Sequence, residues 1–129
     1  MDHTRDVIKS QMAELKDLMK DIAALNTELN SAAPHKQIEL CLKMMEKTSQ
    51  IKTLKEDTQR KIDTMDVHRK KTLAHQLREI TKVIEDQTLH FWHCWHYTQT
   101  KNLWIAMALI YQDAFPECQS PSWSNSTAF

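Results

Sequence analysis

Three histidines and one cysteine lie close together in the last third of the chain, at spacings that suit one face of a helix. His90 and Cys94 are four residues apart, and His90, His93 and His96 follow one another at intervals of three. Residues at such intervals are neighbours on a helix, and imidazole and thiolate are ligands for Zn²⁺ and Cu²⁺. A structural zinc site usually needs four ligands, and no CxxC or HExxH pattern completes one. We therefore interpret the cluster as ordinary histidines among aromatic side chains, with metal binding as the alternative, and expect no cofactor.

The sequence contains no pattern that is typical of a catalytic site. No GxSxG, P-loop, HExxH or CxxC motif occurs, and Gly is absent from all 129 residues. Loops that cradle phosphate groups usually require Gly, because their backbone adopts positive φ angles. The adjacent carboxylates Glu85 and Asp86 point to different sides of a helix and so form no acid–base pair. We expect a protein that is not an enzyme and has no catalytic residues.

The composition favours an all-α fold. Tight β-hairpin turns also depend on Gly, and Pro occurs only at positions 34, 116 and 121. The 17 basic and 17 acidic residues give a net charge of zero, whereas a nucleic-acid-binding chain would show a basic face or arm. The short run Arg69, Lys70 and Lys71 is interpreted as a solvated helix face. Nucleic acid is therefore not an expected partner.

The first 31 residues predict one amphipathic helix, over Thr4 to Asn30. Apolar positions alternate at intervals of four and three, which is the spacing of a helical seam. Asn26 falls within this seam, where a buried Asn can fix the register between helices, and the alternative is that the seam frays and Asn26 is solvated. The seam residues are Ile8, Met12, Leu15, Met19, Ile22, Asn26 and Leu29.

The segment 34–88 predicts one long, charged helix with a second seam. The spacing changes near Arg69, where three successive steps of four replace the alternation and would locally unwind a supercoil. An unbroken helix of this length would extend for about 75 Å, which is too long for one compact small domain. The seam residues are Cys41, Met44, Thr48, Ile51, Lys55, Thr58, Ile62 and Met65, followed by Leu73, Leu77, Ile80 and Ile84.

The break between these two helices is Asn30 to Pro34, a linker short enough to join antiparallel neighbours. The favoured fold is therefore an antiparallel helical hairpin with a long second helix, similar to a coiled coil. Turn-forming residues at 63–66 and 85–88 allow an alternative, a four-helix bundle. The hairpin is preferred because neither of these candidate turns contains Gly or Pro.

The segment 89–115 differs from the rest because it is aromatic and nearly uncharged. Polar residues interrupt it too often for a membrane-spanning helix, so we expect a helix that packs in a bundle core, with binding to a membrane surface as the alternative. The segment 116–129 is rich in Ser and Pro and predicts a disordered tail. Its last residues, Thr127 to Phe129, also fit the pattern read by PDZ-type domains.

These patterns predict a helical interaction or scaffold protein that self-associates, or joins a larger assembly, through its seams. The expected partners are other proteins or a second copy of the chain. Three widely spaced cysteines and no apolar leader favour a reducing compartment, and we expect the cytoplasm. The residues expected to mediate association are Ile22, Asn26, Ile51, Ile62, Leu77, Ile80 and Ile84, and those expected to dock a partner are Trp92, Trp95 and Trp104.

Overall fold

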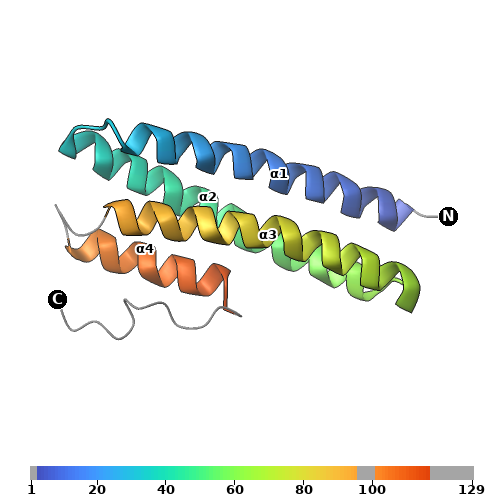
Figure 1. Ribbon diagram of the computed structural model, residues 1–129. Coiled ribbons are helices and arrows are strands. Elements are labelled where there is room, and N and C mark those ends of the chain that lie inside the picture. Colours follow the sequence, from blue (N-terminus) through green and yellow to red (C-terminus); the bar gives the residue numbers. More distant parts are fainter. Residues whose placement is uncertain (1–2, 96–100, 117–129) are drawn as a thin grey trace.

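The chain folds into four helices that run up and down in turn (Figure 1). The computed structural model describes residues 3–95 and 101–116, with the side chains of these residues except 34, 93–95 and 101–104. The helices are α1 (His3–Leu29), α2 (Pro34–Asp63), α3 (Val67–Trp95) and α4 (Lys101–Ala114), and the described residues contain no strand. The predicted all-α class is therefore confirmed.

The antiparallel pair α2 and α3 forms the centre of the molecule. α1 lies along both of these helices, and α4 lies along both of them on the opposite side (Figure 1). In the described residues α1 and α4 do not contact each other. Because α4 has 14 residues and the others have 27 to 30, one end of the molecule contains four helices and the other contains three.

The helix predicted to be continuous over 34–88 is in fact two helices, as in the four-helix alternative. α2 ends at Asp63, and α3 begins at Val67. Asp66 stabilises the start of α3, because its carboxylate accepts a hydrogen bond of 3.0 Å from the backbone N–H of Arg69. Thr64 caps the end of α2, because its hydroxyl donates a hydrogen bond of 2.7 Å to the carbonyl of Lys61. Polar side chains thus make this turn without Gly or Pro.

The second candidate turn, at 85–88, is not present. α3 runs without a break from Val67 to Trp95, so the boundary predicted between the segments 34–88 and 89–115 falls inside this helix. The rod of about 75 Å that a continuous second helix would require is therefore also absent, because the chain reverses at the turn after Asp63.

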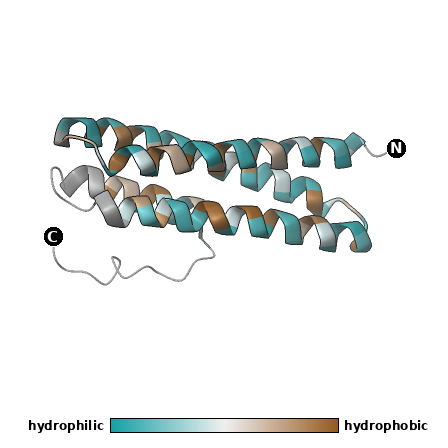
Figure 2. Ribbon diagram, turned by 45° about the horizontal axis from the view of Figure 1, so that its top comes forward, coloured by the Kyte–Doolittle hydropathy of each residue, from teal (hydrophilic) through white to brown (hydrophobic). Residues whose placement is uncertain are grey.

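The predicted seams form the core that joins the helices. Hydrophobic and polar residues alternate along the long helices (Figure 2), and most predicted seam positions are buried. Threonines at four core positions are accommodated because their hydroxyls donate to carbonyls of their own helix, as Thr48 does to Met44 at 2.7 Å. The buried seam residues are Ile8, Met12, Leu15, Ile22, Leu29, Cys41, Met44, Thr48, Ile51, Thr58, Ile62, Leu73, Leu77 and Ile84.

Asn26 makes a contact between two helices that are not adjacent in sequence. Its side-chain amide donates a hydrogen bond of 3.1 Å to the backbone carbonyl of Gln87 on α3. The side-chain oxygens of both residues are buried and have no hydrogen-bond partner among the described residues. A directional bond at this depth fixes the register of α1 against α3, so the register interpretation of Asn26 describes its place better than the solvated one.

Candidate interaction groove

The C-terminal end of α4 is held by two lysines of α2. Lys55 Nζ donates a hydrogen bond of 3.2 Å to the carbonyl of Ala114 and lies 5.2 Å from the centre of the Phe115 ring. A cation is favourable there, because the carbonyls at the end of a helix carry partial negative charge. One turn earlier on α2, Lys52 Nζ lies 3.1 Å from the carboxylate of Asp113, which raises the pKa of Lys52. These contacts explain why a charged residue, Lys55, occupies a position of the predicted seam.

Two aromatic rings complete this end of the helix. Tyr111 and Phe115 are both buried, and their ring centres lie 5.3 Å apart in a tilted arrangement. The next residue is Pro116, which cannot donate the hydrogen bond that would continue the helix. α4 therefore stops part of the way along the surface formed by α2 and α3.

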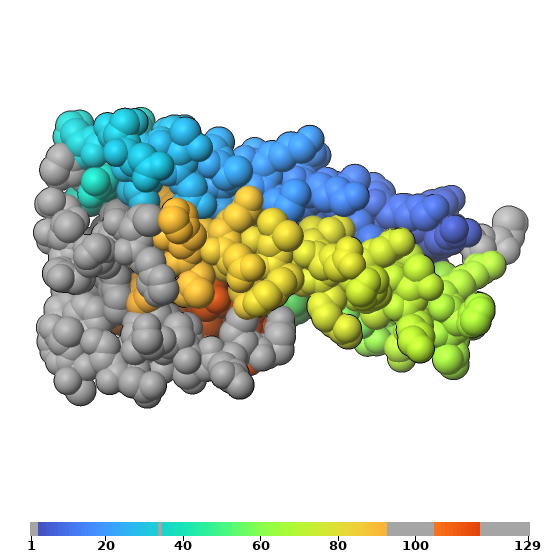
Figure 3. Space-filling model, viewed as in Figure 1, coloured from blue at the N-terminus to red at the C-terminus, as the bar shows by residue number. Residues whose placement is uncertain are grey.

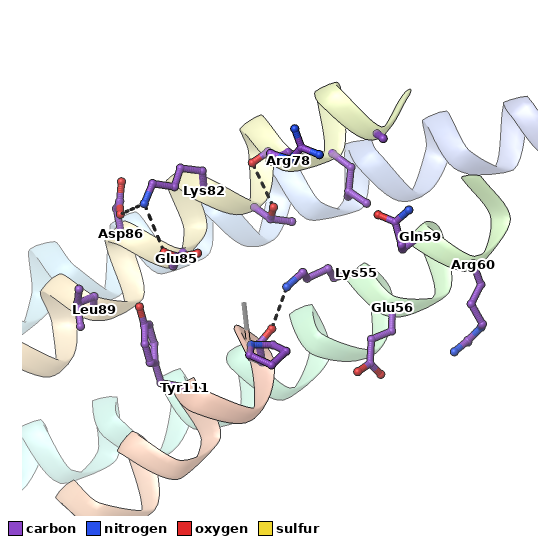
Figure 4. A pocket seen from close by; sticks show the side chains of 15 residues that line it. Lys55, Glu56, Gln59, Arg60, Arg78, Lys82, Glu85, Asp86, Leu89 and Tyr111 are labelled. Atoms are coloured by element: carbon purple, nitrogen blue, oxygen red, sulfur yellow. Dashed lines mark hydrogen bonds and ion pairs between the residues drawn. The ribbon is translucent and has the colours of Figure 1, made fainter. Parts of the chain in front are cut away.

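A groove opens where α4 ends, between α3 and the pair formed by α2 and α4 (Figure 4). Its volume is about 1180 Å³. By contrast, the opposite side of α3 meets α1 along a continuous surface, as the space-filling view shows (Figure 3). The apolar residues that line the groove come from α3, from α4 and from the residue that follows it, and they are Ala74, Leu77, Leu89, Tyr111, Ala114 and Pro116.

Charged side chains border the groove on both sides. Arg78 and Lys82 project from α3, and Glu56 and Arg60 project from α2 on the opposite side (Figure 4). Lys82 pairs with Glu85 and Asp86 of its own helix, at 3.4 and 3.5 Å. Arg60 pairs with Asp57 at 3.1 Å.

Two of these border residues have no such pairing. Among the described residues the side chains of Arg78 and Glu56 make neither a hydrogen bond nor an ion pair within 4.0 Å. The charge of Glu56 acts on Lys52 at longer range and contributes to the raised pKa of that lysine. Within the described part of the chain, the groove therefore presents a cation on α3, Arg78, and an anion on α2, Glu56, that have no ion pair within 4.0 Å.

A separate network of polar side chains joins α1 to the face of α2 that lies against α1. The carboxylate of Asp57 accepts hydrogen bonds from Lys61, from Gln11 at 2.6 Å and from Arg60. These bonds lower the pKa of Asp57 to about 2, and the bond from Lys61 has the largest effect. Thr58 donates to the side-chain oxygen of Gln11 at 3.2 Å. Gln11 thus connects the two helices through two residues of α2.

This network predicts that stability depends on pH in the acid range. The pKa of Asp57 is lower in the folded chain than the value of about 3.9 in an unfolded one, so its contribution is present above about pH 4 and is lost as the pH falls towards 2. We expect the urea midpoint of the wild type to exceed that of Asp57→Asn at pH 5, and the difference to shrink by pH 2. Asp17→Asn is the control, because Asp17 is exposed and has no ion pair in the described part of the chain. An equal difference at both pH values would contradict the prediction.

Most of the residues predicted to contact a partner are used for packing within this single chain. Ile22, Ile51, Ile62, Leu77 and Ile84 are buried in the core, Ile80 is partly buried against it, and Asn26 contacts α3 as described above. Trp92 is buried as well, whereas the side chains of Trp95 and Trp104 lie outside the described residues. The structure thus gives these residues an intramolecular use, and their contact with a partner stays a prediction.

The cluster of three histidines and one cysteine lies largely outside the part of the chain that the structure describes. His90 is exposed on α3, but the side chains of His93 and Cys94 and the whole of His96 are outside it. The described residues contain no group of three or more side chains that could hold a metal ion. Metal binding therefore stays an untested alternative to the interpretation as ordinary histidines. Recognition of Thr127 to Phe129 is untested as well, because the segment 117–129 is outside the described residues.

Two further findings bear on chemistry and on membranes. Cys41 is a free thiol in the core, and burial raises its pKa to about 12, so the unreactive protonated form prevails at neutral pH. Within residues 3–95 and 101–116, no helix has both the length and the apolar character to cross a membrane.

Comparison of the chain with protein-family models, with curated proteins and with solved structures finds no match.

The sequence patterns do not predict the groove, because Ala74, Arg78 and Glu56 lie off both seams. A signal for it is the lysine at seam position 55, which marks where α4 ends.

Proposed function

We propose that this chain is a non-enzymatic helical interaction protein, which joins a larger assembly by accepting an amphipathic helix of a partner protein. The single observation that carries the proposal is that α4 occupies the surface between α2 and α3 over only part of its length. The remaining part is an open groove that is lined by apolar residues of α3 and α4 and bordered by charged residues of α2 and α3. Binding of a helix in a groove is a common mode of peptide recognition.

The size of the groove supports a helix as the ligand. From Leu89 to Ala74 the groove follows about four turns of α3, or roughly 22 Å at 1.5 Å per residue. α4 provides an example of a helix on the same surface, because it buries side chains at intervals of one, three and four residues. These side chains are Met107, Ala108, Tyr111 and Ala114, with Phe115 directly after the helix.

Self-association is the other form of the proposal. Because the seams are used within one chain, a second copy would have to bind through a surface outside the core, and the groove is available to it. A reducing compartment such as the cytoplasm is part of the proposal, since it would keep the buried thiol of Cys41 free.

Selection from a displayed library of 15-residue amphipathic helices against the full chain tests the proposal. We expect the selected peptides to bind the wild type and to lose at least tenfold in affinity for Ala74→Arg, whose long side chain would fill the groove. Ala13→Arg is the matched control, because Ala13 is exposed on α1 away from the groove. Selection of no peptide that distinguishes Ala74→Arg from Ala13→Arg would refute the proposal.

Binding to a membrane surface is a second candidate, and one observation favours it. Ile105 and Leu109 lie one turn apart on α4 and are 38% and 58% exposed. Apolar side chains on one face of a surface helix can enter the lipid interface. Phe91, Trp92 and Tyr111, however, are buried in the bundle, so fewer aromatic side chains are available for it than the segment 89–111 contains. Co-flotation of the full chain with liposomes tests this candidate.

A further inference from the structure

We infer that the groove selects a partner helix with a carboxylate on the side that faces Arg78 and a cation on the side that faces Glu56, and that these two contacts set the direction in which the helix lies. The inference rests on the proposed function, because it describes the ligand of the same groove.

The contact between α2 and α4 provides the first argument. Lys52 of α2 pairs across the helix boundary with Asp113 of α4, at 3.1 Å. Glu56 is the next residue along this side of α2, because residues four apart are neighbours on a helix surface. α4 ends at Ala114, so no side chain of α4 continues the pairing. A helix that occupies the groove beyond α4 would meet Glu56 in the place where α4 meets Lys52, and a basic residue would complement it.

The second argument is that the other charges at the borders already have partners. Lys55 binds the end of α4, Arg60 binds Asp57, and Lys82 binds Glu85 and Asp86. A ligand that paired with these residues would have to displace contacts that exist. Arg78 has no such contact among the described residues and projects from α3 beside the groove (Figure 4). An acidic residue of the ligand can therefore pair with Arg78 without the loss of another ion pair.

The positions of the two charges determine the direction of the ligand. Arg78 and Glu56 lie on opposite sides of the groove, one on α3 and the other on α2 (Figure 4). A helix that keeps its apolar face towards the groove and is turned end for end exchanges its two flanks. Acidic residues on one flank and basic residues on the other therefore match the groove in one direction and are repelled in the reverse direction. Complementary charges of this kind contribute to specificity more than to affinity.

The library selection described above also tests the inference, when the sequences of the selected peptides are compared. Peptides selected on the full-length wild type are expected to carry Asp or Glu on one flank and Lys or Arg on the other. In fluorescence anisotropy, their affinity is expected to fall by roughly threefold to tenfold for Arg78→Glu and for Glu56→Lys. The double variant Glu56→Lys with Arg78→Glu keeps the net charge of the protein, and the same peptides are expected to regain affinity for it by binding in the reverse direction. Lys16→Glu on α1 is the control, because Lys16 is exposed and lies away from the groove.

Each outcome separates this inference from the proposed function. Peptides that are sensitive to Ala74→Arg but carry no consistent flank charges, or whose affinity is lowered by each single charge reversal and is not regained in the double variant, would overturn the inference and leave the proposed function intact. If light scattering shows that the wild type forms dimers and that Ala74→Arg does not, the occupant is a second copy and the inference is wrong. It is also wrong if replacement of Trp123, the one tryptophan of the segment 116–129, by Ala in the full chain strengthens peptide binding more than tenfold, because this segment would then be the occupant.

Discussion

Replacement of Ile84 by Asp is expected to unfold the bundle, with a loss of roughly 4 kcal/mol or more in the free energy of unfolding. Ile84 is fully buried on α3, in a core cluster to which all four helices contribute. A carboxylate at this position would have to be buried without a partner, or else the helices would have to separate. Because small domains are stable by only about 5–15 kcal/mol in total, a loss of this size removes a large part of the stability.

Urea unfolding followed by circular dichroism measures this effect, and the neighbouring residue provides the control. Val83 precedes Ile84 on the same helix but is 45% exposed, so Val83→Asp is expected to change the free energy of unfolding by about 0.5 kcal/mol or less. The experiment also separates the intramolecular use of the seam from association between copies. If Ile84→Asp kept the stability of the wild type but lost an oligomer that the wild type forms, the seam would serve association and this prediction would be wrong.

The core could be predicted from the sequence because it depends on periodicity alone. Residues such as Ile22, Ile51 and Leu77 recur at intervals of three and four, and helix geometry places such residues on one face whatever their neighbours are. The same periodicity does not say which helix covers that face. The seam after Ile62 was therefore compatible with a second chain and with α1 of the same chain, and the reversal at 64–66 is what brings it against α1.

That reversal was hard to predict because its signals are shared with helix interiors. Asp66 and Thr64 stabilise the turn through side-chain hydrogen bonds, yet Asp and Thr also occur on solvated helix faces throughout this sequence. The absence of Gly and Pro from this stretch favours a continuous helix. It was misleading because Thr64 keeps a right-handed conformation, with φ −86° and ψ −8°, so the turn does not require Gly at this position.

The groove could not be predicted, because it depends on where one helix stops against two others. Lys55 occupies a seam position that an apolar residue would normally fill, and the sequence indicates no partner for it. The partners are the carbonyl of Ala114 and the ring of Phe115, which lie about 60 residues further along the chain. The same holds for Asn26, whose contact with Gln87 requires α1 and α3 to lie side by side.

Replacement of Phe115 by Ala is expected to release α4 while α1, α2 and α3 stay folded. Phe115 is 1% exposed, and its ring contacts Tyr111 and Lys55. Loss of a buried Phe side chain costs about 3–5 kcal/mol in the free energy of unfolding. α4 has 14 residues and contacts α2 and α3 but not α1, and a helix of this length is marginal without tertiary packing. The cost should therefore fall on local opening of α4 and not on the whole bundle.

Amide hydrogen exchange distinguishes local release from global destabilisation. Exchange of amides in residues 105–115 is expected to accelerate by roughly 100-fold or more, since each 1.4 kcal/mol changes an equilibrium about tenfold. Amides in α1 near Leu15, which lies far from α4 in the fold, should keep their protection. Leu109→Ala is the control on the same helix, because Leu109 is 58% exposed and its loss should change exchange little. Equal acceleration in all four helices would show that α4 belongs to one cooperative unit with the rest. Acceleration confined to α4 would mean that α1, α2 and α3 form a stable platform, on which α4 and a partner helix occupy successive parts of one surface.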